Sequence, residues 1–246
     1  MLARGEHILS QGVELARDLQ LMGGLDVGEL TVSASVYPAE LSAHRAVGRL
    51  IRAHPNIRCR VKVCDWRRAA SDVRHREADL ALAETSEAAE QSQLATRLVG
   101  SHRLVFFCRP GHPLASGNEV SLDDVLAYPW VSTRAPMRMT RSFPKNLRAA
   151  GWIDGSNGDF VSAIQVAHLT AGKHVVADSN AIGAAPPVLI DKELNFGALV
   201  ELPLSEPWLH LNYGFIYLRD RTLSPAAEAF IREVETVEAE LAARQR

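Results

Sequence analysis

An arginine at the end of a predicted strand is the residue best suited to bind a small molecule. Arg134 follows Tyr128–Ser132, an apolar segment that we interpret as a strand, and Arg138 and Arg141 lie close behind it. A guanidinium group grips a carboxylate or phosphate through two hydrogen bonds. The alternative for this basic cluster is a solvated loop. The predicted anion site here consists of Ser132, Thr133 and Arg134.

A second candidate position is the turn between the first predicted strand and the first predicted helix. Glu29–Ser35 is predicted to be a strand, and Pro38 opens a helix that ends at His54. The first backbone N–H groups of a helix lack intrahelical acceptors and favour an anion. We therefore expect Ser35 and Tyr37 to contact a ligand. Simple N-capping is the alternative, and the two roles are compatible.

Two further strand ends in the first half of the chain carry polar or aromatic side chains. Asp65 and Trp66 follow the alternating strand that begins at Ile57, and Glu84 follows the apolar run Ala78–Ala83. Since parallel strands end at the same edge of a sheet, we expect these side chains in the same crevice. Trp66 is as well suited to packing against the core as to stacking on a ligand ring. For Glu84 the alternative is a solvated loop position.

The second half of the chain supplies the remaining candidates. The pattern predicts a short helix at Lys145–Ala150, a helix from Ser162 to Gly172 and a strand at His174–Ala177. A helix start and a strand end both face the ligand crevice in α/β folds. Topology, not a motif, assigns the site residues that flank the last two elements. They are Phe160, Val161, Asp178 and Ser179.

The sequence has no residue pattern typical of an enzyme or a metal site. Ser142 and Lys145 match the S-x-x-K pattern of serine acylases, but the companion S-D-N and K-T-G motifs are absent. None of the nine histidines has a metal-spaced partner. Cys59 and Cys64 fall on opposite faces of one predicted strand and cannot pair there. We therefore expect no catalytic residues, no cofactor and no metal.

The composition is that of an ordinary globular chain. The 246 residues are 47% apolar and 23% charged, with a net charge of -2. This charge gives no reason to expect nucleic-acid binding by this chain alone. No apolar run reaches the roughly 20 residues that span a bilayer, and residues 1–25 are amphipathic, unlike a secretory signal. With an odd number of cysteines, these features predict a cytoplasmic location and no membrane partner.

The order of the predicted elements indicates two α/β lobes behind an amphipathic helix. Pro110, Gly111 and Pro113 break the buried strand Leu104–Cys108, where we expect the chain to cross into a second lobe. We predict an α/β fold of two Rossmann-like lobes joined by two crossovers, with a ligand between them. The predicted divisions are 1–27 for a linker and dimerisation helix, 28–106 with 209–246 for lobe I, and 107–208 for lobe II.

Four segments together resemble the effector-binding region of the LysR-type transcriptional regulators. No segment is specific alone, but their order and spacing are, and they span nearly the whole chain. They are Gly28–Val32 after the amphipathic helix, His54–Ile57 with Glu77–Ala81, Arg109–Ala115, and Leu223–Ala227.

The resemblance implies the periplasmic-binding-protein type II fold, a small-molecule effector and assembly as a homodimer or homotetramer. In that family a winged helix-turn-helix precedes the linker helix and binds DNA. We expect this chain to begin within the linker helix and to reach DNA only through such a module. Family members often have Thr or Ser at two positions of the first strand-to-helix turn. Ser35 matches the first, but the second falls on Tyr37.

The expected function is sensing of an anionic effector and oligomerisation within a LysR-type regulator. A solute-binding protein of a transport system on the same fold is the first alternative. An enzyme on a two-lobed scaffold is the second, since a fold does not determine a function.

Overall fold

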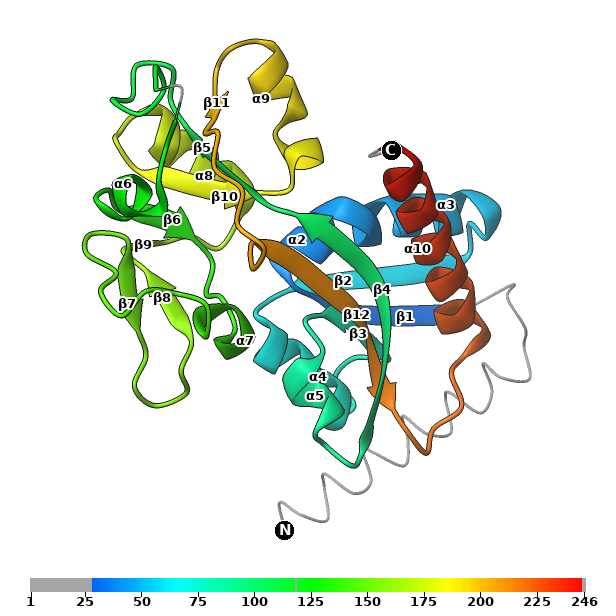
Figure 1. The fold of residues 1–246 in the computed structure, drawn as a ribbon. Coiled ribbons are helices and arrows are strands. Elements are labelled where there is room, and N and C mark those ends of the chain that lie inside the picture. Colours follow the sequence, from blue (N-terminus) through cyan, green and yellow to red (C-terminus); the bar gives the residue numbers. More distant parts are fainter. Residues whose placement is uncertain (1–27, 118, 245–246) are drawn as a thin grey trace.

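Two five-stranded sheets lie side by side in the computed structural model, which describes residues 28–117 and 119–244 (Figure 1). The first has the strand order β2-β1-β3-β12-β4, and the second has the order β11-β5-β10-β6-β9. Strands β7 and β8 form a separate hairpin-like pair. The predicted α/β fold with two sheets is confirmed. The predicted helix over 1–27 lies outside the described residues.

The first sheet combines parallel and antiparallel strands. Strand β1 pairs in parallel with β2 and β3, whereas β12 runs antiparallel to β3 and β4. Buried β3 is central, and β2, with its outward charges, is at the edge. The strands are β1 (Gly28–Ala34), β2 (Ile57–Val63), β3 (Leu80–Ala83), β4 (Leu94–Arg103) and β12 (His210–Leu218).

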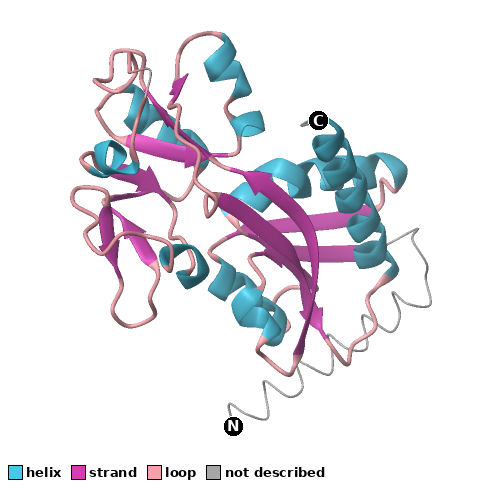
Figure 2. Ribbon diagram, viewed as in Figure 1, coloured by secondary structure: helices cyan, strands magenta, loops and turns pink. Residues whose placement is uncertain are grey.

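Helices cover both faces of the first sheet (Figure 2). Leu80 and Leu82 pack with α3 and α10, while Ala81 and Ala83 pack with α4, because alternate side chains of a strand face opposite sides. The helical elements are α2 (Val36–Pro38), a π-helical turn η1 (Ala39–Ala43), α3 (His44–Ala53), α4 (Trp66–Arg74), α5 (Ser86–Ala89) and α10 (Pro225–Arg244). The apolar stripe of α10 is buried at Phe230, Val234, Val237 and Leu241.

The second sheet has its own helices and its own core. Phe106, Trp130 and Phe160 are buried in it. Its strands are β5 (Val105–Cys108), β6 (Trp130–Ser132), β9 (Ile164–Gln165), β10 (Ile182–Ala185) and β11 (Val200–Glu201), beside β7 (Gly151–Ile153) and β8 (Phe160–Ser162). Its helices are α6 (Leu122–Leu126), α7 (Met137–Thr140), α8 (Leu169–Ala177), η2 (Pro187–Leu189) and α9 (Asp191–Asn195).

Three predicted elements of the second half are wrong. Lys145–Ala150 forms turns, and Arg148 has a φ of 48°, which a right-handed helix does not contain. Ser162 ends strand β8 and caps no helix. The helix instead begins at Leu169 and continues through Ala177, so the predicted strand His174–Ala177 is helical. Adjacent Val175 and Val176 favour a strand locally, but Val176 packs into the core from the helix.

The chain passes between the sheets twice. It leaves the first sheet after Arg103 of β4 and enters the second at Val105 of β5, and it returns between β11 and β12. Val105 and Phe106 therefore pair within the second sheet, although the predicted lobe I runs to 106. The lobe limits themselves remain a prediction. Within the described ranges, no helix combines the length and apolarity that a membrane crossing requires.

Asp72 fastens α4 to the first sheet from a buried position. Its carboxylate is 2% exposed and accepts hydrogen bonds from Ser33 Oγ at 2.6 Å and Arg68 Nε at 2.5 Å. Burial by itself raises the pKa of Asp72, but the bonds from Ser33 and Arg68 and the charge of Lys62 outweigh it and lower the pKa below 3.8. The ionised carboxylate therefore stabilises the fold.

Replacing Asp72 with Asn should lower the free energy of unfolding at pH 7 by about 1–3 kcal/mol, because Arg68 and Lys62 lose their anion. A lowered pKa stabilises the native state above the unfolded value of 3.8 and loses this effect as the pH falls through the folded pKa. The difference between wild type and variant should therefore shrink between about pH 5 and about pH 3. Urea unfolding across this range measures it, with exposed Glu90→Gln as control. A difference that stays constant with pH would contradict the account.

Candidate functional site

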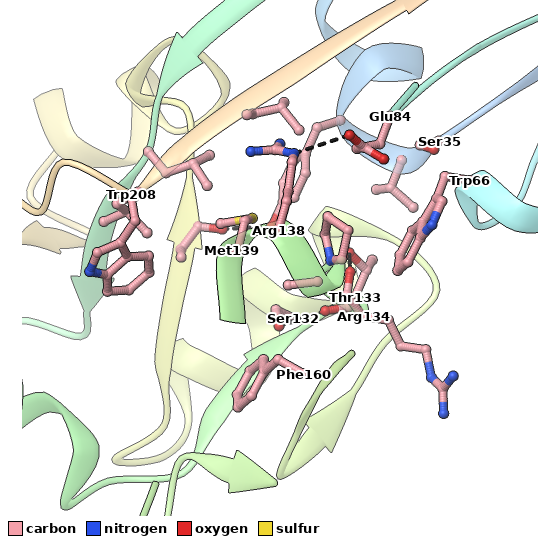
Figure 3. Close-up of a pocket in the computed structure, with 18 of the residues that line it drawn as sticks. Ser35, Trp66, Glu84, Ser132, Thr133, Arg134, Arg138, Met139, Phe160 and Trp208 are labelled. Atoms are coloured by element: carbon pink, nitrogen blue, oxygen red, sulfur yellow. Dashed lines mark hydrogen bonds and ion pairs between the residues drawn. The ribbon is translucent and has the colours of Figure 1, made fainter. Parts of the chain in front are cut away.

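A pocket of about 100 Å³ lies between the two sheets, at the ends of β1, β3 and β6. We call it the Arg138 pocket (Figure 3). Three of the four tryptophans of the chain line it. Its lining residues are Ser35, Val36, Tyr37, Pro38, Trp66, Glu84, Leu104, Phe106, Trp130, Ser132, Thr133, Arg134, Ala135, Pro136, Arg138, Met139, Phe143, Phe160, Ala184, Trp208, Leu209 and Leu211.

A second hollow of about 390 Å³ adjoins the first, and we call it the His168 pocket. The two pockets share Ser35, Val36, Trp66, Thr133 and Arg134, so together they form one crevice. The residues found only in the second are Val63, Cys64, Asp65, Gln165, Val166, Ala167 and His168. The second hollow is the more polar of the two, because it adds a carboxylate, an amide and an imidazole.

The structure brings most of the sequence-predicted residues to this crevice. Asp65 lines the His168 pocket. Those that line the Arg138 pocket are Ser35, Tyr37, Trp66, Glu84, Ser132, Thr133, Arg134 and Phe160. The carboxyl ends of parallel strands and the following helix starts meet here, as the sequence pattern predicted.

Val161, Asp178 and Ser179 line neither pocket. Val161 follows Phe160 on β8, and neighbouring strand residues point to opposite faces, so only Phe160 reaches the pocket. Asp178 and Ser179 end helix α8, not a strand, and the Ser179 hydroxyl donates to Val175 O at 2.6 Å. Their assignment followed from the wrong strand at His174–Ala177.

Ser35, which lines the crevice, has a buried and uncommitted hydroxyl. It occupies the N-cap position of a helical stretch that runs from Val36 to Ala53, but its side chain makes no capping hydrogen bond. Its Oγ is buried and has no hydrogen-bond partner among the described residues. The first N–H groups of this helix also have no intrahelical acceptor. An unpartnered hydroxyl and a helix N-terminus thus occur together at the edge of the crevice, a combination that suits an anionic oxygen.

Arg138 is the cation of this pocket, and it pairs across the sheets with Glu84. Its Nε donates to Glu84 Oε1 at 3.1 Å, and its Nη2 lies 3.5 Å from the carbonyl oxygen of His210. Glu84 is only 8% exposed and also accepts from Ser86 N–H at 3.1 Å and Ser86 Oγ at 2.8 Å. Glu84 is thus no solvated loop residue; it follows β3 in one sheet, and α7 carries its partner from the other.

Arg134, which the sequence favoured as the counter-charge, is committed elsewhere. Its Nη2 donates to Asp154 Oδ2 at 2.9 Å, and its guanidinium points away from the other labelled side chains in Figure 3. Hydrogen bonds from Ser156, together with that of Arg134, lower the pKa of Asp154 to about 2. Asp154 is therefore ionised at neutral pH and gives Arg134 an anionic partner. Arg138, named only as a rival from sequence, faces the pocket instead.

Two further contacts join the sheets around the crevice. The Tyr37 hydroxyl donates to Ala184 O of β10 at 2.6 Å, and burial raises the pKa of Tyr37. Arg67 on α4 forms a bidentate pair with the fully buried Asp159, with Nη2 and Oδ1 3.1 Å apart. Tyr37 therefore links the two sheets through its hydroxyl. Its ring lies in the pocket lining and takes up part of the space there.

Sequence reasoning missed most of the apolar wall of the pocket. Phe143 lies in the segment after α7 and Trp208 precedes β12, so neither belongs to a predicted strand end. Trp208 follows the chain-breaking residues Pro203 and Pro207, which were the available signal. Within the described part of the chain, no group of His, Cys, Asp or Glu is arranged to hold a metal ion.

Comparison with known proteins relates this architecture to transcriptional regulators. Residues 23–238 match the family described as the LysR substrate binding domain. The chain is 29% identical over 233 residues to the SDS degradation transcriptional activation protein of Pseudomonas sp. (strain ATCC 19151), covering 93% of this chain and 73% of that protein. It is 25% identical over 235 residues to a probable RuBisCO transcriptional regulator of Synechocystis, covering 95% and 67%.

Solved structures share the fold at lower sequence identity. A putative transcriptional regulator from Vibrio parahaemolyticus matches with a TM-score of 0.68 and 20% identity, covering 89% of this chain and 97% of that chain. The regulatory domain of MetR, a LysR family regulator from N. meningitidis, matches with a TM-score of 0.65 and 18% identity, covering 87% and 94%. The effector binding domain of QuiR in complex with shikimate matches with a TM-score of 0.61 and 16% identity, covering 87% and 98%.

Tyr37→Phe should lower the free energy of unfolding by about 1 kcal/mol, because the Ala184 carbonyl loses its donor. Since the lost bond joins the two sheets, hydrogen exchange should rise at both β10 and the helical turn η1, which follows Tyr37. Mass spectrometry of deuterium uptake measures this. Tyr217→Phe, at a half-buried position of β12, is the matched control. If both variants show the same hydrogen exchange at β10, the Tyr37 hydroxyl does not stabilise the contact between the sheets.

Proposed function

Because this chain belongs to the LysR substrate binding domain family of transcriptional regulators, we propose that its effector is a small organic anion held in the Arg138 pocket. The unpartnered Ser35 hydroxyl at a helix N-terminus is the observation that carries this proposal. Buried polar groups are almost always hydrogen-bonded in native proteins. A donor without an acceptor in a crevice is therefore a position where a ligand can supply one.

The cross-sheet pair offers a way to sense the anion. Arg138 donates to Glu84 through Nε, whereas its Nη2 makes only a long hydrogen bond of 3.5 Å to the carbonyl oxygen of His210. An incoming carboxylate or sulfate would compete with Glu84 for this guanidinium. Because the two partners belong to different sheets, the exchange would change the free energy of one lobe arrangement relative to another. The remaining candidate contacts are Tyr37, Trp66, Ser132, Thr133, Arg134 and Phe160, with Asp65 in the adjoining hollow.

The wider setting is part of the same proposal. Lobe I would comprise 28–106 with 209–246, and lobe II 107–208, behind a linker and dimerisation helix at 1–27. The chain would act in the cytoplasm as a homodimer or homotetramer, and would reach DNA through a separate DNA-binding module. The relatives support a regulator over an enzyme or a transport-type solute-binding protein, because their names describe transcriptional regulation. One is named for SDS degradation, and the QuiR domain was solved with shikimate; both compounds are anions.

Removing the pocket cation should weaken anion binding more than removing the committed arginine. Isothermal titration calorimetry with a panel of small carboxylates and sulfates identifies a binding anion. We expect Arg138→Ala and Ser35→Ala each to weaken it by about tenfold or more, since a charge-assisted hydrogen bond is lost. Arg134→Ala should cost less, because Arg134 is bonded to Asp154.

Arg141→Ala is the matched control, since Arg141 is an exposed arginine three residues beyond Arg138 that lines neither pocket. It should leave the affinity unchanged. A larger loss of affinity in Arg134→Ala than in Arg138→Ala would indicate that Arg134, not Arg138, binds the anion. Binding that survives both Ser35→Ala and Arg138→Ala would place the effector elsewhere.

A further inference from the structure

We propose that the effector has an apolar body and a single compact anionic head, and that the pocket selects against acids rich in hydroxyl groups. This inference rests on the proposed function, because it specifies the chemistry of the ligand in the same pocket. Three observations carry it: an aromatic wall, the commitment of nearly all polar side chains, and the position of the anion-binding groups at one end.

The aromatic wall is a continuous cluster of rings from the second lobe. The ring centroid of Phe143 lies 4.7 Å from that of Trp208 and 5.3 Å from that of Phe160. Trp130 stands 5.4 Å from Phe160 and 6.1 Å from Phe143. Phe160 and Trp130 are buried, whereas Phe143 and Trp208 are half-buried. The pocket therefore offers ring faces and edges to a ligand, which favour alkyl or aromatic groups.

The hydroxyl groups of the pocket are largely used within the protein. Tyr37 donates to Ala184 O at 2.6 Å, Ser132 Oγ to Thr133 O at 2.8 Å, and Thr133 Oγ1 to Arg134 O at 3.4 Å. Among the side chains that line the pocket, all within the described ranges, Ser35 alone keeps a buried oxygen without a partner.

The indole N–H groups are used in the same way. Nε1 of Trp66, Trp130 and Trp208 each donates at 3.0 Å to an oxygen of a residue that does not line the pocket. A ligand with several hydroxyl groups would thus find few free donors for its oxygens, and each buried oxygen left without a donor is costly. A ligand with one polar head avoids that cost.

The polar and apolar groups lie at different ends of the pocket. Figure 3 shows the Arg138 guanidinium beside Glu84, with Ser35 beyond Glu84, whereas Trp208 lies at the left of the view and Phe160 at the bottom. A head group between Ser35 and Arg138 would direct the rest of the molecule toward the rings. The dimensions of the adjoining His168 pocket allow a larger and more polar molecule, so that hollow is the rival location for a hydroxyl-rich acid.

A matched pair of ring acids tests the inference directly. Shikimate and the cyclohexene carboxylate that lacks its hydroxyl groups share the ring and the carboxylate. Calorimetry should show the deoxygenated acid binding at least about tenfold more tightly, because it leaves no hydroxyl unsatisfied. Its binding should also have a negative heat-capacity change between about 15 and about 30 °C, the sign of apolar burial. Octanoate should bind as well, and neutral octanol more weakly than octanoate.

Substitution of a residue in the aromatic wall provides a second test of the inference. Trp208→Ser should weaken the binding of cyclohexene carboxylate by about tenfold and that of shikimate much less, since only the former depends on apolar contact. Trp152→Ser, at a tryptophan that is 53% exposed and outside both pockets, should change neither affinity. Circular dichroism establishes that both variants are folded.

The outcomes separate this inference from the proposed function. Shikimate could instead bind more tightly than cyclohexene carboxylate, with binding abolished by Ser35→Ala and unchanged by Trp208→Ser. This result would overturn the proposal of an apolar body but would support an anion site at Ser35. Binding of octanol as tightly as octanoate overturns the anionic head. Failure of every acid to bind overturns both proposals.

Discussion

The ion pair between Glu84 and Arg138 is the contact on which the geometry of the crevice depends. It joins a buried carboxylate, which follows a central strand of one sheet, to a half-buried guanidinium from a short helix beside the other. Burying a charge without a partner costs several kcal/mol or more, so each residue constrains where the other can be. The two sheets are therefore held at a separation that leaves a narrow pocket between them.

Further cross-sheet contacts reinforce this arrangement with different chemistry. Tyr37 contributes a neutral hydrogen bond to a backbone carbonyl, and Arg67 neutralises the buried Asp159. None of these contacts consumes the hydroxyl of Ser35. The crevice is thus closed by groups that satisfy one another, which leaves a small number of positions where a ligand can compete.

Local pattern was sufficient for the first sheet because its elements are long and their burial is one-sided or complete. Leu80–Ala83 is an unbroken apolar run, and the charges of Ile57–Val63 fall on one face, so centre and edge could be assigned. The ten-residue strand β4 was not predicted, since its exposed and buried positions follow no regular alternation. In the second lobe, three-residue strands carry little periodic signal, and tertiary packing decided that Val175 and Val176 are helical.

The site was predictable as far as it follows from topology. Side chains at the ends of β1, β3 and β6 could be assigned to one crevice from the order of strands and helices along the sequence. The choice between Arg134 and Arg138 could not be predicted from the sequence, because it depends on which arginine pairs with Asp154 and which pairs with Glu84. The aromatic wall was equally hidden, since Phe143 and Trp208 reach it from irregular segments.

The π-helical turn at Ala39–Ala43 has a consequence for the helix that begins at the ligand crevice. A wide turn contains an added residue, and each residue of a regular helix advances the direction of the side chains by roughly 100°. Tyr37 precedes this irregularity and Ser42 lies within it, and the two meet quite different neighbours, Ala184 O of the second sheet and the buried Tyr213 hydroxyl. Deleting one residue here would restore regular winding and rotate one contact out of register with the other. Length in this stretch is therefore as informative as residue identity when relatives of this chain are aligned.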